Sequence, residues 1–94
     1  MTETTMPLTL KLYRRPDCHL CDDAEVLLAD AIAAQATAAI VERIDITTDP
    51  LLEARYGTRI PVVAIGADEI DLVTSAGRIR RLLERAGSVP PAAG

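Results

Sequence analysis

Two cysteines, three positions apart, are the residues of this chain best suited by type and spacing to do chemistry. They stand in Cys18-His19-Leu20-Cys21, and the sequence holds no other cysteine. A two-residue spacer lets one sulfur reach the other, so the pair could make and break a disulfide by thiol exchange. Thiolates are also soft metal ligands, and cysteine is often buried for packing alone. The motif by itself leaves redox, metal-binding and packing roles open.

Charged residues flank the cysteines and act on the sulfurs in opposite directions. The start of a helix stabilises an anion by only about 0.3–1 kcal/mol, so nearby side chains decide the balance. The acids are Asp17, Asp22 and Asp23, and the cations are Arg14, Arg15 and His19 when protonated. We expect these effects nearly to cancel, which favours a reductant or exchange role over that of a strong oxidant.

Length and composition fit one small globular domain. The chain has 94 residues, of which 49% are hydrophobic and 26% charged, a balance unlike that of disordered segments. Phe and Trp are absent, so the core must consist of Leu, Ile, Val and Ala. We treat residues 1–94 as one domain with an ordered core of about 8–87, and we expect 1–7 and 88–94 to be loose termini.

Charge and hydropathy argue against several classes of partner. A net charge of −4 and a pI near 4.8 disfavour nucleic acid and anionic membrane surfaces, both of which attract clustered Lys and Arg. No window approaches the roughly 18 apolar residues of a spanning helix, and residues 1–7 lack the pattern of a secretory signal. We expect a cytoplasmic monomer. In that compartment a cysteine pair is normally kept reduced, so we do not expect a structural disulfide.

Periodic patterns predict the elements that position the cysteines, in the order β-α-β-α-β-β-α. The segment between the first two strands is long enough for a right-handed crossover, which makes those strands parallel. The short turn 66–68 makes the last two strands a hairpin. This predicts a four-stranded mixed α/β sheet with helices on its faces. The expected strands are 8–13, 40–46, 62–65 and 69–72, and the expected helices are 20–34, 50–56 and one capped by Thr74 or Ser75 and closed by Gly87.

The cysteines fall between the first strand and the first helix. Cys18 precedes the helix proper, so we expect its sulfur to be exposed, close to unpaired backbone N–H groups that stabilise a thiolate. Cys21 lies within the first turn. If the pair exchanges disulfides, Cys18 is the attacking sulfur and Cys21 is the one that resolves the mixed disulfide.

The order of elements with Cys18-x-x-Cys21 at the first helix resembles the thioredoxin-like superfamily. A second segment, YGTRIPVV at 56–63, resembles that superfamily's approach to a cis-proline before the third strand. The resemblance implies strand order 2-1-3-4 with helices on both faces of the sheet. It also implies a cis Ile60-Pro61 bond lying against Cys18, and an Ile60 backbone that is free to pair with a substrate strand.

Because the chain begins with the strand that precedes the cysteines, it is more similar to a glutaredoxin than to a full thioredoxin. The similarity covers roughly residues 8–86 and points to short bacterial glutaredoxin-like proteins. Glutaredoxins carry a basic residue three positions before the first cysteine, where it meets a carboxylate of glutathione, and Arg15 stands there. Two departures are clear: the family's Cys-Pro-Tyr-Cys is Cys-His-Leu-Cys here, and its Gly-Gly pair is absent from IDLV at 70–73.

These observations predict a thiol-disulfide oxidoreductase with Cys18 as nucleophile and Cys21 as resolving thiol. Its expected substrates are protein disulfides or glutathione mixed disulfides. No resident cofactor or metal is implied, and glutathione or a thioredoxin reductase would supply electrons. The expected substrate-binding residues are Arg15, Arg14, His19, Leu20, Ile60 and Pro61.

Two alternatives remain open at this point. Cys18 and Cys21, with His19, could hold Cu(I) or share a cluster in a transfer module. The same fold could also serve as a redox-silent partner-binding domain. A structural zinc site would normally need four ligands, more than this segment offers from Cys and His.

Overall fold

The computed structural model describes residues 8–35 and 38–88. The predicted loose termini lie outside the described residues, apart from Ser88. The elements are β1 (Leu8–Arg14), α1 (His19–Ala34), β2 (Ala39–Asp45), the 3₁₀ turn η1 (Ile46–Thr48), α2 (Pro50–Tyr56), β3 (Val62–Ile65), β4 (Asp68–Ile70) and α3 (Ala76–Ser88).

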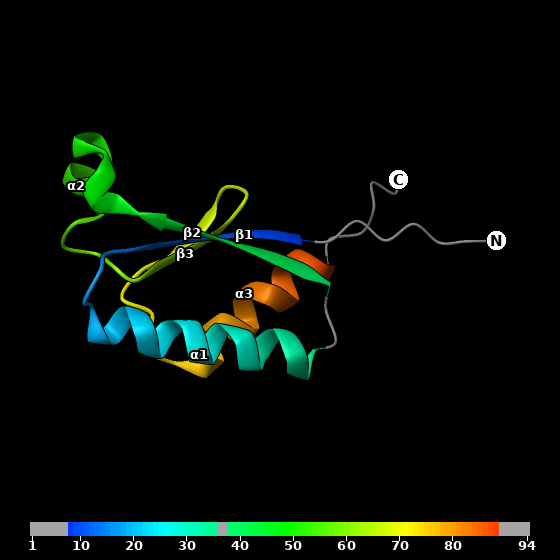
Figure 1. Cartoon of the computed structure of the whole chain (residues 1–94). Helices are drawn as coiled ribbons and strands as arrows, with labels where there is room; N and C mark the ends of the chain where they lie inside the picture. Colours follow the sequence, from blue (N-terminus) through cyan, green and yellow to red (C-terminus); the bar gives the residue numbers. More distant parts are fainter. Residues whose placement is uncertain (1–7, 36–37, 89–94) are drawn as a thin grey trace.

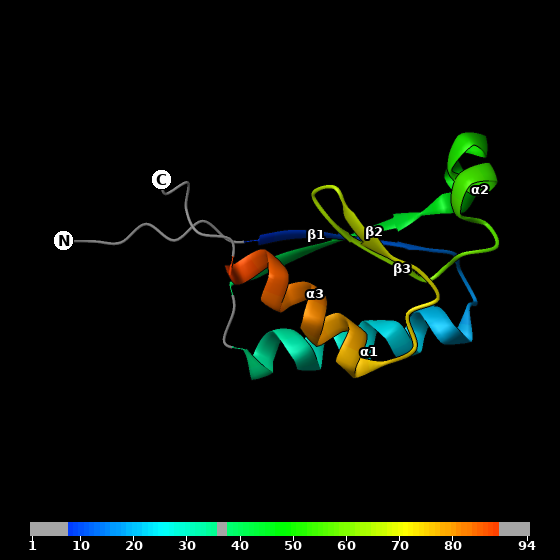
Figure 2. The same cartoon turned by 180° about the vertical axis from the view of Figure 1, so that it is seen from behind.

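The four strands form one mixed sheet in the order β2-β1-β3-β4, which confirms the predicted α/β fold and strand order. β1 is parallel to β2 and antiparallel to β3, and β4 pairs with β3 as a hairpin. Helices α1 and α3 cover one face, whereas α2 lies on the other side near one end (Figures 1 and 2).

The pairing of β1 with β3 decides where the site lies. Tyr13, near the end of β1, is opposite Val62, the first residue of β3. Because the two strands run in opposite directions, the loop that follows β1 and the loop that precedes β3 meet at the same edge of the sheet. The topology therefore brings the cysteine segment to the segment containing Pro61.

Side-chain caps start the helices where the sequence predicts. Asp49 Oδ1 accepts the Leu51 N–H at 2.9 Å, and Pro50 occupies the first turn of α2. Ser75 Oγ accepts the Arg78 N–H at 3.4 Å, so Ser75 is the residue that caps α3. The prediction that Gly87 closes α3 was wrong, because the helix continues through it to Ser88.

Two strands end earlier than the sequence predicts. β2 ends at Asp45, whose carboxylate accepts the Thr47 N–H at 2.9 Å and turns the chain into η1. β4 ends at Ile70, before Leu72, which has a φ of 47° in the left-handed region that an extended strand does not use. The Leu72 N–H donates instead to the Arg59 carbonyl at 2.9 Å. The chain thus leaves the sheet to close over the loop before β3.

Aliphatic residues make up most of the core, as the composition predicts. β1 places Leu10 and Leu12 on the face that meets α1 and α3, whereas Tyr13 points to the α2 side, as strand alternation requires. On that side the buried Tyr56 stacks on Tyr13 with ring centroids 4.1 Å apart. The buried cluster under α1 and α3 is Leu10, Leu12, Leu28, Val63, Val73, Ile79, Leu82 and Leu83.

Among the described residues no helix is long and apolar enough to cross a membrane.

Candidate active site

The cysteine pair lies at the start of α1 and is joined as a disulfide, with the two Cα atoms 5.1 Å apart. Cys18 is the N-cap, and its sulfur accepts the Cys21 N–H at 3.2 Å. Cys18 is partly exposed, whereas Cys21 is fully buried. Asp17, with a φ of 57°, turns the chain into the helix, a conformation that Asp tolerates better than most residues. One sulfur is thus accessible beside a helix N-terminus, and the other is shielded.

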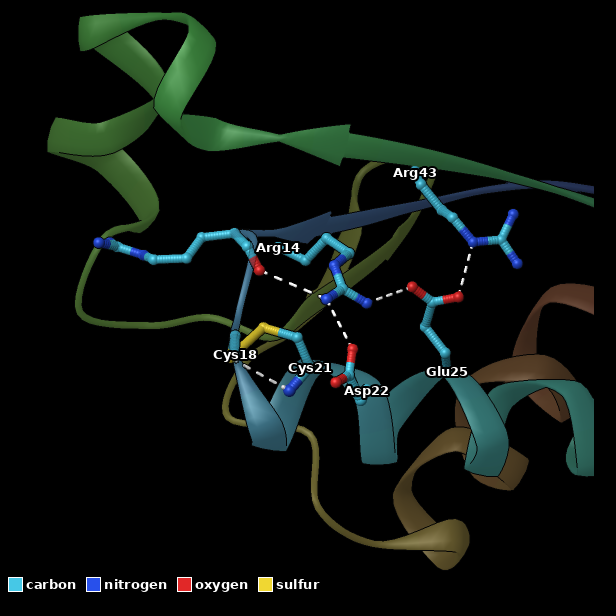
Figure 3. A network of polar contacts seen from close by, with 7 residues as sticks. Arg14, Cys18, Cys21, Asp22, Glu25 and Arg43 are labelled. Atoms are coloured by element: carbon cyan, nitrogen blue, oxygen red, sulfur yellow. Dashed lines mark hydrogen bonds and ion pairs between the residues drawn. A yellow bond between two sulfur atoms is a disulfide. The ribbon is translucent and has the colours of Figure 1, made fainter.

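Arg14 binds two carboxylates of α1 and so ties that helix to the end of β1 (Figure 3). Its Nη2 donates to Asp22 at 2.7 Å and to the Arg15 carbonyl at 3.4 Å, and its Nη1 donates to Glu25. Arg43 of β2 donates to the other Glu25 oxygen at 2.6 Å. We call Arg14, Asp22, Glu25 and Arg43 the cysteine-loop network.

Within the cysteine-loop network, two pKa values are shifted toward the charged forms, those of Arg14 and Glu25. The hydrogen bond to Asp22 raises the pKa of Arg14, against the effect of partial burial. Partial burial raises the pKa of Glu25, but the hydrogen bonds from Arg43 and Arg14 outweigh it and leave that pKa below its ordinary value. The guanidinium of Arg14 holds two carboxylates in this placement, and its role as a substrate-binding group stays a prediction.

Arg15 extends to the other side of the sheet edge and meets the end of α2. Its Nη2 donates to Glu53 Oε1 at 2.8 Å and to the Gly57 carbonyl at 3.3 Å. Gly57 has an ordinary helical φ of −54°, so it is needed here for space and not for a left-handed turn. A Cβ at this position would lie 2.5 Å from the Glu53 carbonyl oxygen.

The segment before β3 has the Ile60-Pro61 peptide bond in the cis form, with Pro61 fully buried. The Pro61 carbonyl accepts the Val73 N–H at 3.1 Å. The expectation that the Ile60 backbone is free was half wrong, because its N–H donates to the Tyr56 carbonyl at 3.1 Å. Within the described loops no backbone amide donates to the Ile60 carbonyl. The pairing of the Ile60 backbone with a substrate strand therefore stays a prediction for its carbonyl alone.

A second set of side chains braces this proline segment, and sequence reasoning missed it. Arg59 donates to Asp71 at 3.1 Å and to Glu69 at 3.2 Å, while the Tyr56 hydroxyl donates to Glu69 at 2.7 Å. We call Tyr56, Arg59, Glu69 and Asp71 the proline-loop network. The only signal in the sequence was the alternation of Glu69 and Asp71 along the predicted hairpin, which does not identify their partners.

Burial and hydrogen bonding shift two pKa values in the proline-loop network. Burial, aided by the hydrogen bond to Glu69, raises the pKa of Tyr56 far above its ordinary value, so this hydroxyl stays a donor. The hydrogen bond from Tyr56, with further help from Arg59, lowers the pKa of Glu69 despite partial burial. Glu69 is therefore held as a carboxylate between a phenol and a guanidinium.

His19 and Leu20, the residues between the cysteines, both face solvent. His19 is 88% exposed, and its Nε2 lies 3.6 Å from an oxygen of Asp23. Leu20 is 47% exposed, a large apolar side chain left uncovered beside the disulfide. Of the predicted site residues, the structure brings Cys18 and Cys21 together, buries Pro61 in the adjoining segment and leaves Leu20 on the surface.

Comparison with solved structures supports the same fold. The X-ray structure of target protein XcR50 from X. campestris has a TM-score of 0.70 and 39% identity, covering 81% of this chain and 96% of that one. A mutant thioredoxin from Halobacterium salinarum has a TM-score of 0.64 at 22% identity, covering 89% and 78%. The germline-specific thioredoxin Deadhead from Drosophila melanogaster has a TM-score of 0.57 at 17% identity, covering 84% and 80%.

These likenesses establish a thioredoxin-like fold, and a Cys-x-x-Cys pair on that fold is consistent with a thiol redox role. A search of curated proteins found no match. The model of the glutaredoxin-like domain (DUF836) matches residues 9–84, which is most of the chain and includes both cysteines and Pro61. The chain therefore belongs to the glutaredoxin-like domain family.

Proposed function

We propose that this protein is a dithiol–disulfide oxidoreductase that reduces disulfides of proteins or mixed disulfides of glutathione. The observation that carries the proposal is the asymmetry of the cysteine pair. Cys18 is partly exposed at the N-terminus of α1, and Cys21 is fully buried one turn away. An accessible sulfur can attack a substrate, while a shielded one is kept for the second step.

The reaction proceeds in two exchanges. In the reduced protein, the Cys18 thiolate attacks one sulfur of the substrate disulfide, so that the substrate S–S bond breaks and its other sulfur leaves as a thiolate that takes up a proton. Cys21 then loses its proton and attacks the Cys18 sulfur of the mixed disulfide. This forms the Cys18–Cys21 disulfide seen in the structure and releases the second substrate thiol. Two electrons pass from the pair to the substrate.

Groups around the sulfurs support each step. The Cys21 N–H, which lies 3.2 Å from the Cys18 sulfur, favours negative charge on that atom. The cysteine-loop network holds α1 in place while the sulfurs change partners. The Ile60 carbonyl accepts a backbone N–H of the substrate, and Leu20 offers an apolar contact next to the attacked disulfide.

The cycle needs an external reductant, which we assign to the thiol class. Two molecules of glutathione, converted to glutathione disulfide, balance the two electrons, and so does one dithiol protein such as a thioredoxin reductase. Such donors are abundant in the cytoplasm, where we place this protein. We further propose that it works as a monomer.

The experiment compares cysteine variants with insulin and with a glutathionylated peptide as substrates, using glutathione or thioredoxin reductase as the electron source. Cys18→Ser is expected to abolish turnover with both. Cys21→Ser is expected to accumulate a mixed disulfide with the insulin chain, visible as a mass increase that dithiothreitol removes. Full reductase activity in Cys18→Ser protein would show that the proposed mechanism is wrong.

A further inference from the structure

Arg14 and Arg15, the arginines nearest to Cys18 in the sequence, are both paired with acids of the same chain, at nitrogen–oxygen distances of 2.7 Å and 2.8 Å. His19, which carries a positive charge only when protonated, has its Nε2 3.6 Å from an oxygen of Asp23. An anionic substrate that approaches the disulfide therefore meets compensated charges within the described part of the chain. The three pairs are Arg14–Asp22, Arg15–Glu53 and His19–Asp23.

Of these side chains, Arg15 is the one that reaches the segment leading to Pro61. It precedes Cys18 by three residues, and its side chain reaches Gly57 on the stretch that leads to Pro61. It thus links the loop after β1 to the segment that leads to Pro61. Its side chain is 37% exposed and that of Glu53 is 38% exposed, so solvent and ligands have access to both.

The ion pair with Glu53 leaves Arg15 able to bind an anion, but with reduced affinity. Both hydrogen bonds use Nη2, and a guanidinium has further donors on Nε and Nη1. A carboxylate of a substrate can therefore still dock on Arg15. The substrate carboxylate then competes with Glu53 for the Arg15 guanidinium, whose positive charge Glu53 already compensates.

Glu53 is held in this place by the backbone of α2. Its N–H donates to the Asp49 carbonyl at 3.0 Å, and its own carbonyl accepts the Gly57 N–H at 2.8 Å. A Cβ at position 57 would lie 3.1 Å from Glu53 Oε1 and 3.6 Å from Arg15 Nη2. The absence of a side chain at Gly57 thus leaves the space in which carboxylate and guanidinium meet.

We propose that Glu53 is a positioning residue that holds Arg15 and sets substrate preference against disulfides with a carboxylate close to the sulfur. This inference rests on the proposed exchange function of the same site. The favoured substrate class is a protein disulfide without a neighbouring carboxylate. The disfavoured class is the mixed disulfide of an acidic thiol, of which glutathione is the test case.

Binding of S-methylglutathione, which cannot exchange, tests the inference without turnover. NMR titration of the reduced protein is expected to show binding to Glu53→Gln that is about two- to fivefold tighter than to wild type, the range for an exposed ion pair. Glu53→Asp, which keeps the charge, is expected to restore most of the wild-type affinity. Glu84→Gln, an exposed site on α3 with the same change in net charge, is expected to have no effect.

The dimethyl ester of S-methylglutathione separates charge from structure. It lacks both carboxylates, so it is expected to bind wild type and Glu53→Gln equally, whereas a general loosening of the site would change both probes alike. Equal affinity of wild type and Glu53→Gln for S-methylglutathione itself would overturn the inference.

Kinetics distinguish a failure of this inference from a failure of the proposed function. With a glutathionylated peptide, Glu53→Gln is expected to lower KM about two- to fivefold with little change in kcat; with a peptide disulfide lacking acids, neither should change. Turnover combined with unchanged KM and unchanged binding would overturn only the role of Glu53. Absence of turnover in every variant, combined with tighter binding by Glu53→Gln, would overturn only the exchange function.

Discussion

Two arginine-centred networks hold the two loops that meet at one edge of the sheet, and they differ in what surrounds the charged groups. In the cysteine-loop network, Arg14 binds acids of the adjoining helix, and these acids lie one and two turns into the helix that Cys18 caps. In the proline-loop network, Arg59 binds acids of the hairpin and lies 5.3 Å over the ring of Tyr56. The first network places charged side chains on the helix that begins at the cysteine pair, whereas the second surrounds a buried aromatic ring.

This difference separates two roles for similar ion pairs. Changes in the cysteine-loop network should alter thiol reactivity more than stability, because its pairs are partly exposed and near the sulfurs. Changes in the proline-loop network should alter stability more than reactivity, because they remove packing around Tyr56. The predictions below test that separation.

Removal of the Tyr56 ring should give the largest effect. Tyr56→Ala leaves a cavity between α2 and the sheet and is expected to lower the free energy of unfolding by about 3–5 kcal/mol, measured by urea denaturation. Tyr56→Phe is the matched control: it keeps the stack on Tyr13, loses the hydrogen bonds of the hydroxyl, among them the one to Glu69, and should cost about 1 kcal/mol. Equal losses in the two variants would contradict the role assigned to the ring.

Substitution at the junction of the two loops should have an intermediate effect. In Gly57→Ala the new Cβ must avoid the Glu53 carbonyl oxygen, which lies 2.5 Å away, so the end of α2 has to shift. We expect a loss of about 1–2 kcal/mol in the free energy of unfolding, since strain from overpacking exceeds the gain in helix propensity. Gly66→Ala is a useful contrast: its added Cβ meets no atom within 4 Å, but its φ of 60° disfavours a side chain.

Neutralising Glu25 should change Cys18 more than it changes stability. Glu25→Gln removes the carboxylate that Arg14 and Arg43 share, so the guanidinium charge near the start of α1 is less compensated. Iodoacetamide is then expected to alkylate the reduced protein at Cys18 about twofold faster at neutral pH, because nearby positive charge favours the thiolate. Glu42→Gln, at an exposed position on β2, is the charge-matched control. A faster reaction in both variants would point to net charge and not to the network.

Acid pH should lower the contribution of both networks to folding stability, and this is the smallest of the expected effects. The pKa values of Glu25 and Glu69 are lowered in the folded protein from an ordinary value of 4.5, so the unfolded chain binds more protons in acid. The stability that these two carboxylates contribute to the fold is therefore fully present above pH 4.5, and it is lost as the pH falls through their pKa values in the folded protein. Thermal unfolding from pH 6 to pH 3 should show a shallower decline of Tm in Glu69→Gln than in wild type. A decline of the same steepness would argue against a paired Glu69 carboxylate.

The predicted elements came close to those observed because their signals are local. Period-two and helical repeats, Asp49-Pro50 at a helix start and an apolar run at 62–65 each depend on a few neighbouring residues. The errors occurred where distant parts intervene. β4 is shorter than predicted because Leu72 bonds to Arg59, and the Ile60 N–H is occupied because α2 ends beside it.

The sequence by itself determined the α/β order of elements, the cysteine pair at the start of a helix and the proline segment before the third strand. Each of these features depends on a short stretch of sequence whose conformation follows from residue type and spacing. Only the tertiary structure decided which partners the arginines take. Arg15 and Glu53 are 38 positions apart, and no repeat or motif links them. Their contact follows from how a loop after β1 and the end of α2 pack at one edge of the sheet, so long-range packing, more than local preference, determines which acids these arginines pair with.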